Sequence, residues 1–143
     1  MNTFLPYSDY SKTASCLDRQ RLGKQRVECV QILKALLYGN SKWINHPAVR
    51  MWKGYEYELL KYSFAICDEW RSRGYADTCK LKMSRLIGDA VISGFKLQNC
   101  KPPWLGDEAL HSSHRSNLLR KNSDYYGKFD WSEIPGAEYV WPV

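Results

Sequence analysis

The sequence predicts an all-α protein, a compact single-domain bundle of three main helices with an irregular aromatic C-terminal tail. Three observations predict it. Apolar residues recur every three or four positions in long segments, and helix-capping and helix-stopping residues flank those segments. The chain has 143 residues with 44% hydrophobic content, enough to bury a core, and contains no repeat, low-complexity tract or linker. We therefore expect residues 1–143 to form one domain.

The first predicted helix begins between Ser11 and Thr13 and ends at Gly39, a residue suited to a left-handed stop. Pro6 keeps the residues before it extended, so we expect them to pack over this helix. The helix has an apolar face made of Cys29, Ile32, Leu33 and Leu36. Gly23 weakens it by about 1 kcal/mol relative to alanine and marks either a kink or a close approach by another part of the chain.

The second predicted helix is long and begins after Asn45 and His46, with Pro47 in its first turn and the Asn45 amide as the cap. It ends at Arg73 and Gly74. Its apolar positions at helical spacing are Ala48, Met51, Trp52, Tyr55, Leu59, Tyr62, Ile66 and Trp70. We expect this row to be core, although a row of aromatic rings could instead stack on bases.

Residues 76–100 have no dominant periodicity, because Gly88 and Gly94 interrupt short apolar stretches, and we assign no element there. After the turn-rich residues 101–106, Asp107 can cap a third helix that runs to about Lys121. Residues 125–143 are aromatic and irregular.

The balance of charges favours a polyanionic partner. There are 21 Lys and Arg against 15 Asp and Glu, a net charge of +6 with a pI near 9.1. The five cysteines are odd in number and form no C-x-x-C pair, so we expect them to be reduced. No segment resembles a membrane span or a signal peptide, and we expect a cytoplasmic protein without a membrane partner.

The most informative pattern is a polar stripe on the first helix, formed by Arg21, Lys24, Gln25 and Glu28. These residues lie at i, i+3, i+4 and i+7 and therefore share one helix face. Such a face could hold a phosphate backbone and present one carboxylate to it. The alternative is a solvated face with ordinary ion pairing between neighbouring turns.

The third predicted helix and the tail also carry side chains that could bind nucleic acid. The polar side of the helix carries His111, His114, Arg115, Asn117, Arg120 and Lys121. The two histidines lack the intervening Glu of a metalloprotease helix, so we expect them to bind phosphate or a carboxylate and expect no metal site. Tyr125 and Tyr126 precede Lys128, a mixture that can stack bases while holding the backbone, or else simply pack on the core.

Together these three elements favour a DNA-processing site. The sequence has no nucleophile elbow, no Gly-rich phosphate loop and no dinucleotide fingerprint, so we expect no cofactor. No second carboxylate is spaced helically from Glu28. An enzyme that cleaves a glycosyl bond can work with a single carboxylate.

The chain resembles the pyrimidine-dimer DNA glycosylases of the phage endonuclease V type. Leu17, Gln20, Leu22 and Glu28 match the spacing of the first helix of that family. Further short matches are the turn at Asn45, His46 and Pro47, the Arg73, Gly74 and Tyr75 helix end, and the closing motif Tyr125, Tyr126 and Gly127. The matches occur in the family's order along most of the chain and are weakest over residues 76–100.

The resemblance implies a helical enzyme that binds duplex DNA, flips a nucleotide and cleaves the N-glycosidic bond of a pyrimidine with an amine nucleophile. It makes Glu28 the catalytic acid and places the nucleophilic α-amine on Asn2 once Met1 is removed. The family has a small residue at that position. Val27 also departs from the family, which has an arginine there. The residues expected to contact DNA are Arg21, Lys24, Gln25, Arg26, His46, His114, Arg115, Asn117, Lys121, Tyr125 and Tyr126.

We therefore expect a monomeric DNA glycosylase with an abasic-site lyase step, acting on a damaged or modified pyrimidine in duplex DNA. Two alternatives remain. One is a non-catalytic module that binds DNA or recognises lesions, and the other is an enzyme of different chemistry on a base or nucleotide.

Overall fold

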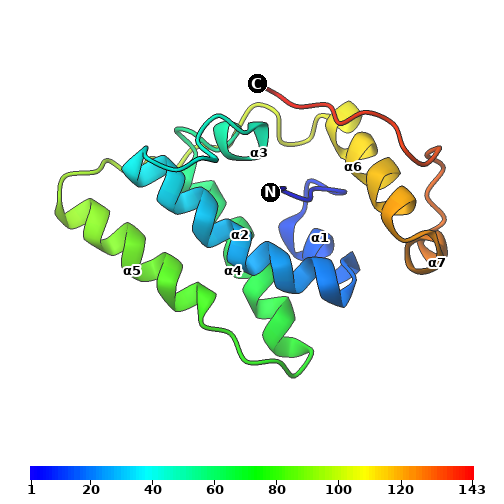
Figure 1. Ribbon diagram of the computed structural model, residues 1–143, viewed down its shortest axis with the longest axis horizontal. Helices are drawn as coiled ribbons and strands as arrows, with labels where there is room; N and C mark the ends of the chain where they lie inside the picture. Colours follow the sequence, from blue (N-terminus) through cyan, green and yellow to red (C-terminus); the bar gives the residue numbers. More distant parts are fainter.

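The computed structural model describes residues 1–143 and is all-helical, as the sequence predicts. The elements follow in the order α1 (Tyr10–Cys16), α2 (Arg19–Tyr38), α3 (Pro47–Arg50), α4 (Glu56–Ser72), α5 (Cys79–Ile92), α6 (Glu108–Lys121), α7 (Ser123–Tyr126) and a 3-10 helix (Gly127–Phe129). Helix α2 packs against α3, α4 and α5, and α1 packs against α4. Helices α6 and α7 lie on the other side of the N-terminal residues from α2 (Figure 1). None of the helices combines the length and the apolar character needed to cross a bilayer.

The first predicted helix is two helices. Leu17 and Asp18 have extended backbone angles and separate α1 from α2. The backbone N–H of Asp18 donates to the hydroxyl of Tyr126 (3.0 Å), a partner that only tertiary structure could supply. The predicted end is confirmed, because Gly39 follows α2 with a φ of 69°.

The second predicted helix is also divided, into α3 and α4. Residues 51–55 form turns between them, with Gly54 at a φ of 85°. The cap of α3 is the imidazole of His46, whose Nδ1 accepts from the N–H of Ala48 (3.0 Å), and not the Asn45 amide. The predicted stop at Gly74, with a φ of 97°, is confirmed.

Helix α5 occupies the middle of the segment that the sequence left unassigned. Its buried residues are only Cys79 and Met83, and Gly88 lies inside it. The third predicted helix is confirmed as α6, capped by the carboxylate of Asp107, which accepts from the N–H of Ala109 (3.1 Å). The tail was expected to be irregular from residue 125 onward, which is wrong for residues 125–129, because they lie in α7 and the 3-10 helix. Residues 130–143 have no regular secondary structure apart from one turn, as expected.

The core is one cluster of 25 buried apolar residues. The aromatic row of the second predicted helix contributes Trp52, Tyr62 and their apolar neighbours, which confirms that it is core. Four cysteines are buried and Cys100 is exposed, and all five are free thiols.

Gly23 marks a close approach and not a kink. A Cβ atom at this position would lie 2.8 Å from the indole ring of Trp70, so the missing side chain lets α4 pack against α2.

Candidate active site

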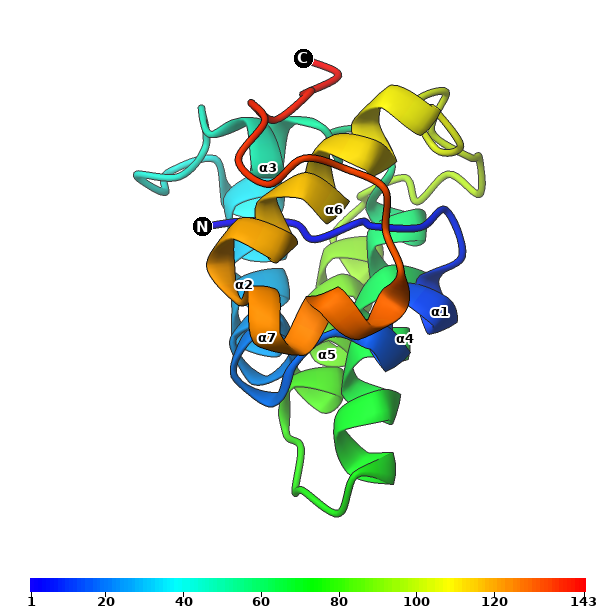
Figure 2. The ribbon, with the colours of Figure 1, turned by 90° about the vertical axis from the view of Figure 1, so that its right-hand side faces the viewer.

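The first seven residues, here called the N-terminal segment, run through the interior of the molecule. They pass between α2 and α6 in Figure 1 and alongside α6 in Figure 2. Residues 3–6 are buried. Buried backbone N–H and C=O groups in an extended chain need partners, and here side chains of the surrounding helices provide them.

Gln25 of α2 holds the segment with both ends of its amide. Its Nε2 donates to the carbonyl of Asn2 (2.9 Å), and its Oε1 accepts from the N–H of Phe4 (2.9 Å). From α4, the hydroxyl of Tyr62 donates to the carbonyl of Phe4 (2.6 Å). Gln25 was predicted to contact DNA, but it is buried and bound to the protein's own backbone.

Helix α6 holds the segment from the other side. Nδ1 of His111 lies 2.8 Å from the carbonyl of Leu5, and Nδ1 of His114 accepts from the N–H of Leu5 (3.3 Å). Nε2 of His111 accepts from the N–H of Gly106, which leaves Nδ1 as the donor. The fully buried His114 has its pKa lowered to about 3, chiefly because burial disfavours its charged form. It therefore cannot reach DNA, contrary to expectation.

These contacts bring the start of the chain to Glu28. The backbone nitrogen of Asn2 lies 2.5 Å from Oε2 of Glu28, and the terminal ammonium of Met1 lies 4.0 Å from the same oxygen. Nζ of Lys24 is 3.6 Å from Oε1. Only 7% of the Glu28 side chain is exposed. Its carboxylate thus faces the N-terminus and a cation, and not open solvent.

A pocket of about 170 Å³ opens at this point. Its lining residues are Met1, Asn2, Phe4, Gln20, Arg21, Lys24, Glu28 and Lys121. It brings together the first helix, the end of α6 and the N-terminus, as the sequence predicts for Arg21, Lys24, Glu28 and Lys121. Burial and the neighbouring cations Arg120, Arg21 and Lys24 lower the pKa of Lys121, while Glu28 opposes that shift.

Arg21 is fixed at the pocket wall through Asp18. Its guanidinium lies 3.2 Å from the Asp18 carboxylate, which also accepts a hydrogen bond from the hydroxyl of Tyr126. Tyr126 is fully buried, so it cannot stack on bases as predicted. Tyr125 is half-buried, with Nζ of Lys128 4.0 Å from its ring centroid and its hydroxyl bonded to the carbonyl of Leu17 (3.3 Å).

Several predicted DNA-contacting residues have structural partners instead. Arg26 forms an ion pair with Asp77 (2.5 Å) and lies over the ring of Trp70. Arg115 pairs with Glu108 and Glu133, and it also donates to the carbonyl of Pro6 (2.8 Å). Neither guanidinium lines the pocket, and the expectation that they hold phosphates stays a prediction.

His46 and Asn117 also lie outside the pocket lining. Nδ1 of His46 caps α3, and its ring lies edge-on to Trp141 (6.2 Å between centroids). Burial lowers the pKa of His46 and the nearby N-terminus adds to this effect, whereas Glu28 opposes it. Asn117 donates to the carbonyl of Ala137 (2.7 Å) and so binds the tail.

One contact at the site has no signal in the sequence. Nδ2 of Asn2 donates to the hydroxyl of Tyr139 (3.0 Å), which brings the C-terminal tail against the N-terminus. Tyr139 stands in an irregular segment without periodicity, and no motif distinguishes it from the other tail aromatics. Gln20 was recognised only as part of the family spacing, and it lines the pocket.

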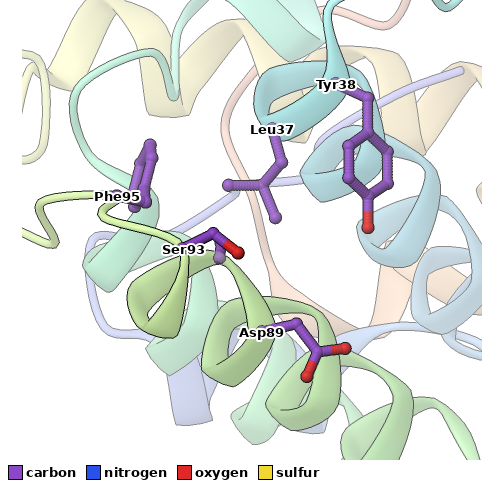
Figure 3. Close-up of a pocket in the computed structure, with 6 residues that line it drawn as sticks. Leu37, Tyr38, Asp89, Ser93 and Phe95 are labelled. Atoms are coloured by element: carbon purple, nitrogen blue, oxygen red, sulfur yellow. The ribbon is translucent and has the colours of Figure 1, made fainter.

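A larger cavity, of about 440 Å³, lies between the ends of α2 and α5. Figure 3 shows Leu37 and Tyr38 of α2 on one side, with Asp89, Ser93 and Phe95 on the other. Asp89 is its only charged residue. Leu37 is nine residues beyond Glu28, about 14 Å along the helix. The larger cavity therefore lacks the charge and chemistry of the smaller pocket.

The pocket at Glu28 combines an amine, a carboxylate and cations. A neutral amine there could attack an electrophilic carbon, the carboxylate could accept its proton, and Arg21, Lys24 and Lys121 could hold an anionic substrate. No three His, Cys, Asp or Glu side chains come together as a metal-ligand group.

Comparisons with known proteins agree with this chemistry. A family model described as pyrimidine dimer DNA glycosylase matches residues 1–83 of the 143-residue chain. The matched residues include the N-terminal segment, α2 and Glu28. No curated protein and no solved structure matches the chain.

Proposed function

The chain belongs to the pyrimidine dimer DNA glycosylase family, and we propose that it removes a damaged pyrimidine from duplex DNA with its N-terminal amine and Glu28. The observation that carries this proposal is the 2.5 Å separation between the Asn2 nitrogen and Glu28 Oε2. Removal of Met1 would turn that nitrogen into the terminal amine. In this proposal residues 1–143 act as one domain and as a monomer.

DNA binding is assigned to the cations at the pocket mouth. Arg21, Lys24 and Lys121 contact phosphates, which fixes the position of the duplex without reading its sequence. The lesion nucleotide leaves the stack, because its anomeric carbon is inaccessible inside a duplex. The pocket is smaller than the roughly 300–1,000 Å³ of sites that enclose drug-sized ligands, so it suits a sugar and its phosphate.

The glycosylase step follows from the two groups at the centre. The amine nitrogen bonds to C1′ of the sugar while the N-glycosidic bond breaks, and the pyrimidine leaves with the electron pair of that bond. Glu28 stabilises the positive charge that develops on the sugar and accepts the proton that the amine loses.

An abasic-site lyase step uses the same groups. Glu28 returns its proton to the ring oxygen O4′ as the C1′–O4′ bond breaks, which opens the sugar and converts the amine adduct into a protonated imine at C1′. Glu28 then removes a proton from C2′, and the electron pair expels the 3′ phosphate oxygen.

The test is cleavage of the N-glycosidic bond in ultraviolet-irradiated duplex DNA by the full chain and by Glu28→Gln. It is read as strand breaks after alkali treatment, because the base of a dimer stays linked to its neighbour when one glycosidic bond breaks. The substitution removes the proton acceptor but keeps the shape of the side chain, so turnover should fall by about 10²–10⁴ while the Kd for DNA changes little. Glu69→Gln, a variant of a partly exposed α4 residue paired with Arg73, is the matched control and should retain turnover.

Equal turnover by Glu28→Gln would contradict the assigned role. Binding of irradiated DNA by the unaltered protein without alkali-labile strand breaks would favour a non-catalytic module.

A further inference from the structure

The side chain of Asn2 is held at both ends. Its Nδ2 donates to the Tyr139 hydroxyl (3.0 Å), and its Oδ1 accepts from the N–H of Thr3 (2.8 Å). An amide with both ends bonded has few rotamers left. The direction of the neighbouring α-nitrogen toward Glu28 is therefore coupled to the position of the Tyr139 hydroxyl.

The tail that carries Tyr139 is anchored on α6 on either side of it. Before it, Oγ of Ser116 donates to the carbonyl of Ile134 (2.5 Å) and accepts from the N–H of Ala137 (2.9 Å). After it, the N–H of Val140 donates to Oγ of Ser113 (3.0 Å). Figure 2 shows the tail crossing the face of α6.

The ring of Tyr139 is also confined. Its centroid lies 5.0 Å from that of His114 and 5.1 Å from that of Trp141. Burial raises the pKa of Tyr139, while the Asn2 amide, Arg120 and Arg21 oppose that rise. The hydroxyl is thus a neutral group beside the pocket cations, and its position is set by α6 and not by solvent.

We propose that Tyr139 is a positioning residue, which acts through the Asn2 side chain to keep the terminal amine against Glu28. The inference rests on the proposed function. It extends the active site to residues 134–141, beyond the residues that the family model matches, and it gives Asn2 a purpose that a smaller side chain could not serve.

The test is a double-mutant cycle of Tyr139→Phe and Asn2→Ala, read by borohydride trapping on duplex DNA that contains an abasic site. Misplacing a reacting group by about 1 Å can cost ~100-fold in rate, and loss of one orienting bond should cost ~10-fold. We expect the trapping rate of Tyr139→Phe to fall ~10-fold, with its Kd for the abasic duplex within about twofold of the unaltered value.

Coupling between the two residues is the decisive readout. In the Asn2→Ala background, Tyr139→Phe should change the rate less than about twofold, because its partner is already gone. Tyr38→Phe removes a hydroxyl at the distant cavity and is the matched control, expected to trap at the unaltered rate. Intact mass spectrometry of each variant identifies its N-terminal residue.

Three results would overturn the inference alone: an unaltered trapping rate for Tyr139→Phe, the same rate loss in both backgrounds, or an effect confined to Kd. Absence of both trapping and alkali-labile strand breaks with the unaltered protein would overturn the proposed function, and this inference with it.

Discussion

Gln25 and Glu28 lie about one turn apart on α2 and hold the backbone of Asn2 from two directions. Gln25 donates to its carbonyl, and Glu28 accepts from its nitrogen. At the scale of single residues, these contacts therefore hold the backbone nitrogen of Asn2 in one position. The cations Arg21, Lys24 and Lys121 line the pocket around it, where Lys24 is also paired with Glu28 and Arg21 with Asp18.

Removing one pocket cation should weaken DNA binding through electrostatics. Lys24→Ala and Lys121→Ala should each reduce the slope of log K against log salt by about 0.9, the value expected for one lost phosphate contact. The measurement is a titration by fluorescence anisotropy between about 50 and 200 mM salt. Lys34→Ala, an exposed position farther along α2, is the control.

Arg26→Ala should behave like that control, because Arg26 is paired with Asp77 and does not line the pocket. Slopes that stay unchanged for Lys24→Ala and Lys121→Ala, or that fall for Arg26→Ala, would contradict this assignment of the cations.

Helical periodicity predicted that Arg21, Lys24 and Glu28 share one face of a helix, and the structure brings them to one pocket together with Lys121 of α6. Sequence reasoning misassigned Gln25, His114 and Tyr126. In a sequence such polar side chains look able to contact DNA. In the structure Gln25 and His114 accept hydrogen bonds from the N-terminal segment, and Tyr126 donates to Asp18. Only tertiary structure reveals such partners.

At the scale of elements, the packing of α4 against α2 depends on Gly23. The Trp70 ring occupies the space that a side chain would need, and it also lies against the Arg26 guanidinium (4.5 Å to the ring centroid). This contact lies on the helix that carries Glu28. A change here would alter both stability and the position of the polar stripe.

Gly23→Ala should lower the free energy of unfolding by up to about 2 kcal/mol. Overpacking costs typically 1–3 kcal/mol, and the gain in helix propensity offsets about 1 kcal/mol of it. Gly88→Ala in α5 is the matched control, since nothing lies within 4 Å of its added Cβ, and it should raise stability by up to about 1 kcal/mol. Urea denaturation measures both, and a stabilised Gly23→Ala would contradict the packing argument.

The sequence predicted the ends of helices better than their interruptions. Gly39, Gly74 and Asp107 have local signals that act as stops and caps. The break at Leu17 and Asp18 has none, because Tyr126 stabilises it from more than a hundred residues away. Helix α5 escaped recognition because Gly88, a residue that disfavours helix, lies inside it.

At the scale of the whole molecule, the N-terminal segment is the layer between α6 and the helices around α2 (Figure 1). Its buried backbone is bonded from α2, α4 and α6, so the amine position is set by three helices at once. Sequence patterns predicted that these residues are extended and pack on the first helix. They could not predict that α6 would cover them.

This arrangement makes stability depend on pH through His114. Its pKa is about 3 in the folded protein and about 6.5 in an unfolded chain, so acid favours the unfolded state. The stabilisation linked to neutral His114 is fully present above pH 6.5. As pH falls toward 3, the free energy of unfolding should decrease by up to about 1.4 kcal/mol per pH unit.

Urea denaturation of the unaltered protein and His114→Asn between pH 7 and pH 4 checks this dependence. The Asn oxygen can replace the Nδ1 acceptor for Leu5 without titrating, so the stability advantage of the unaltered protein should shrink in acid. A constant difference would show that His114 does not titrate on unfolding as argued.

The most direct test of the account identifies the atom that bonds to DNA. The protein is trapped with borohydride on a duplex containing an abasic site, digested, and mapped by mass spectrometry. The account predicts one adduct, on the α-amine of the N-terminal peptide. An adduct on the side chain of Lys24 or Lys121, or strand cleavage at the abasic site without any adduct, would contradict it.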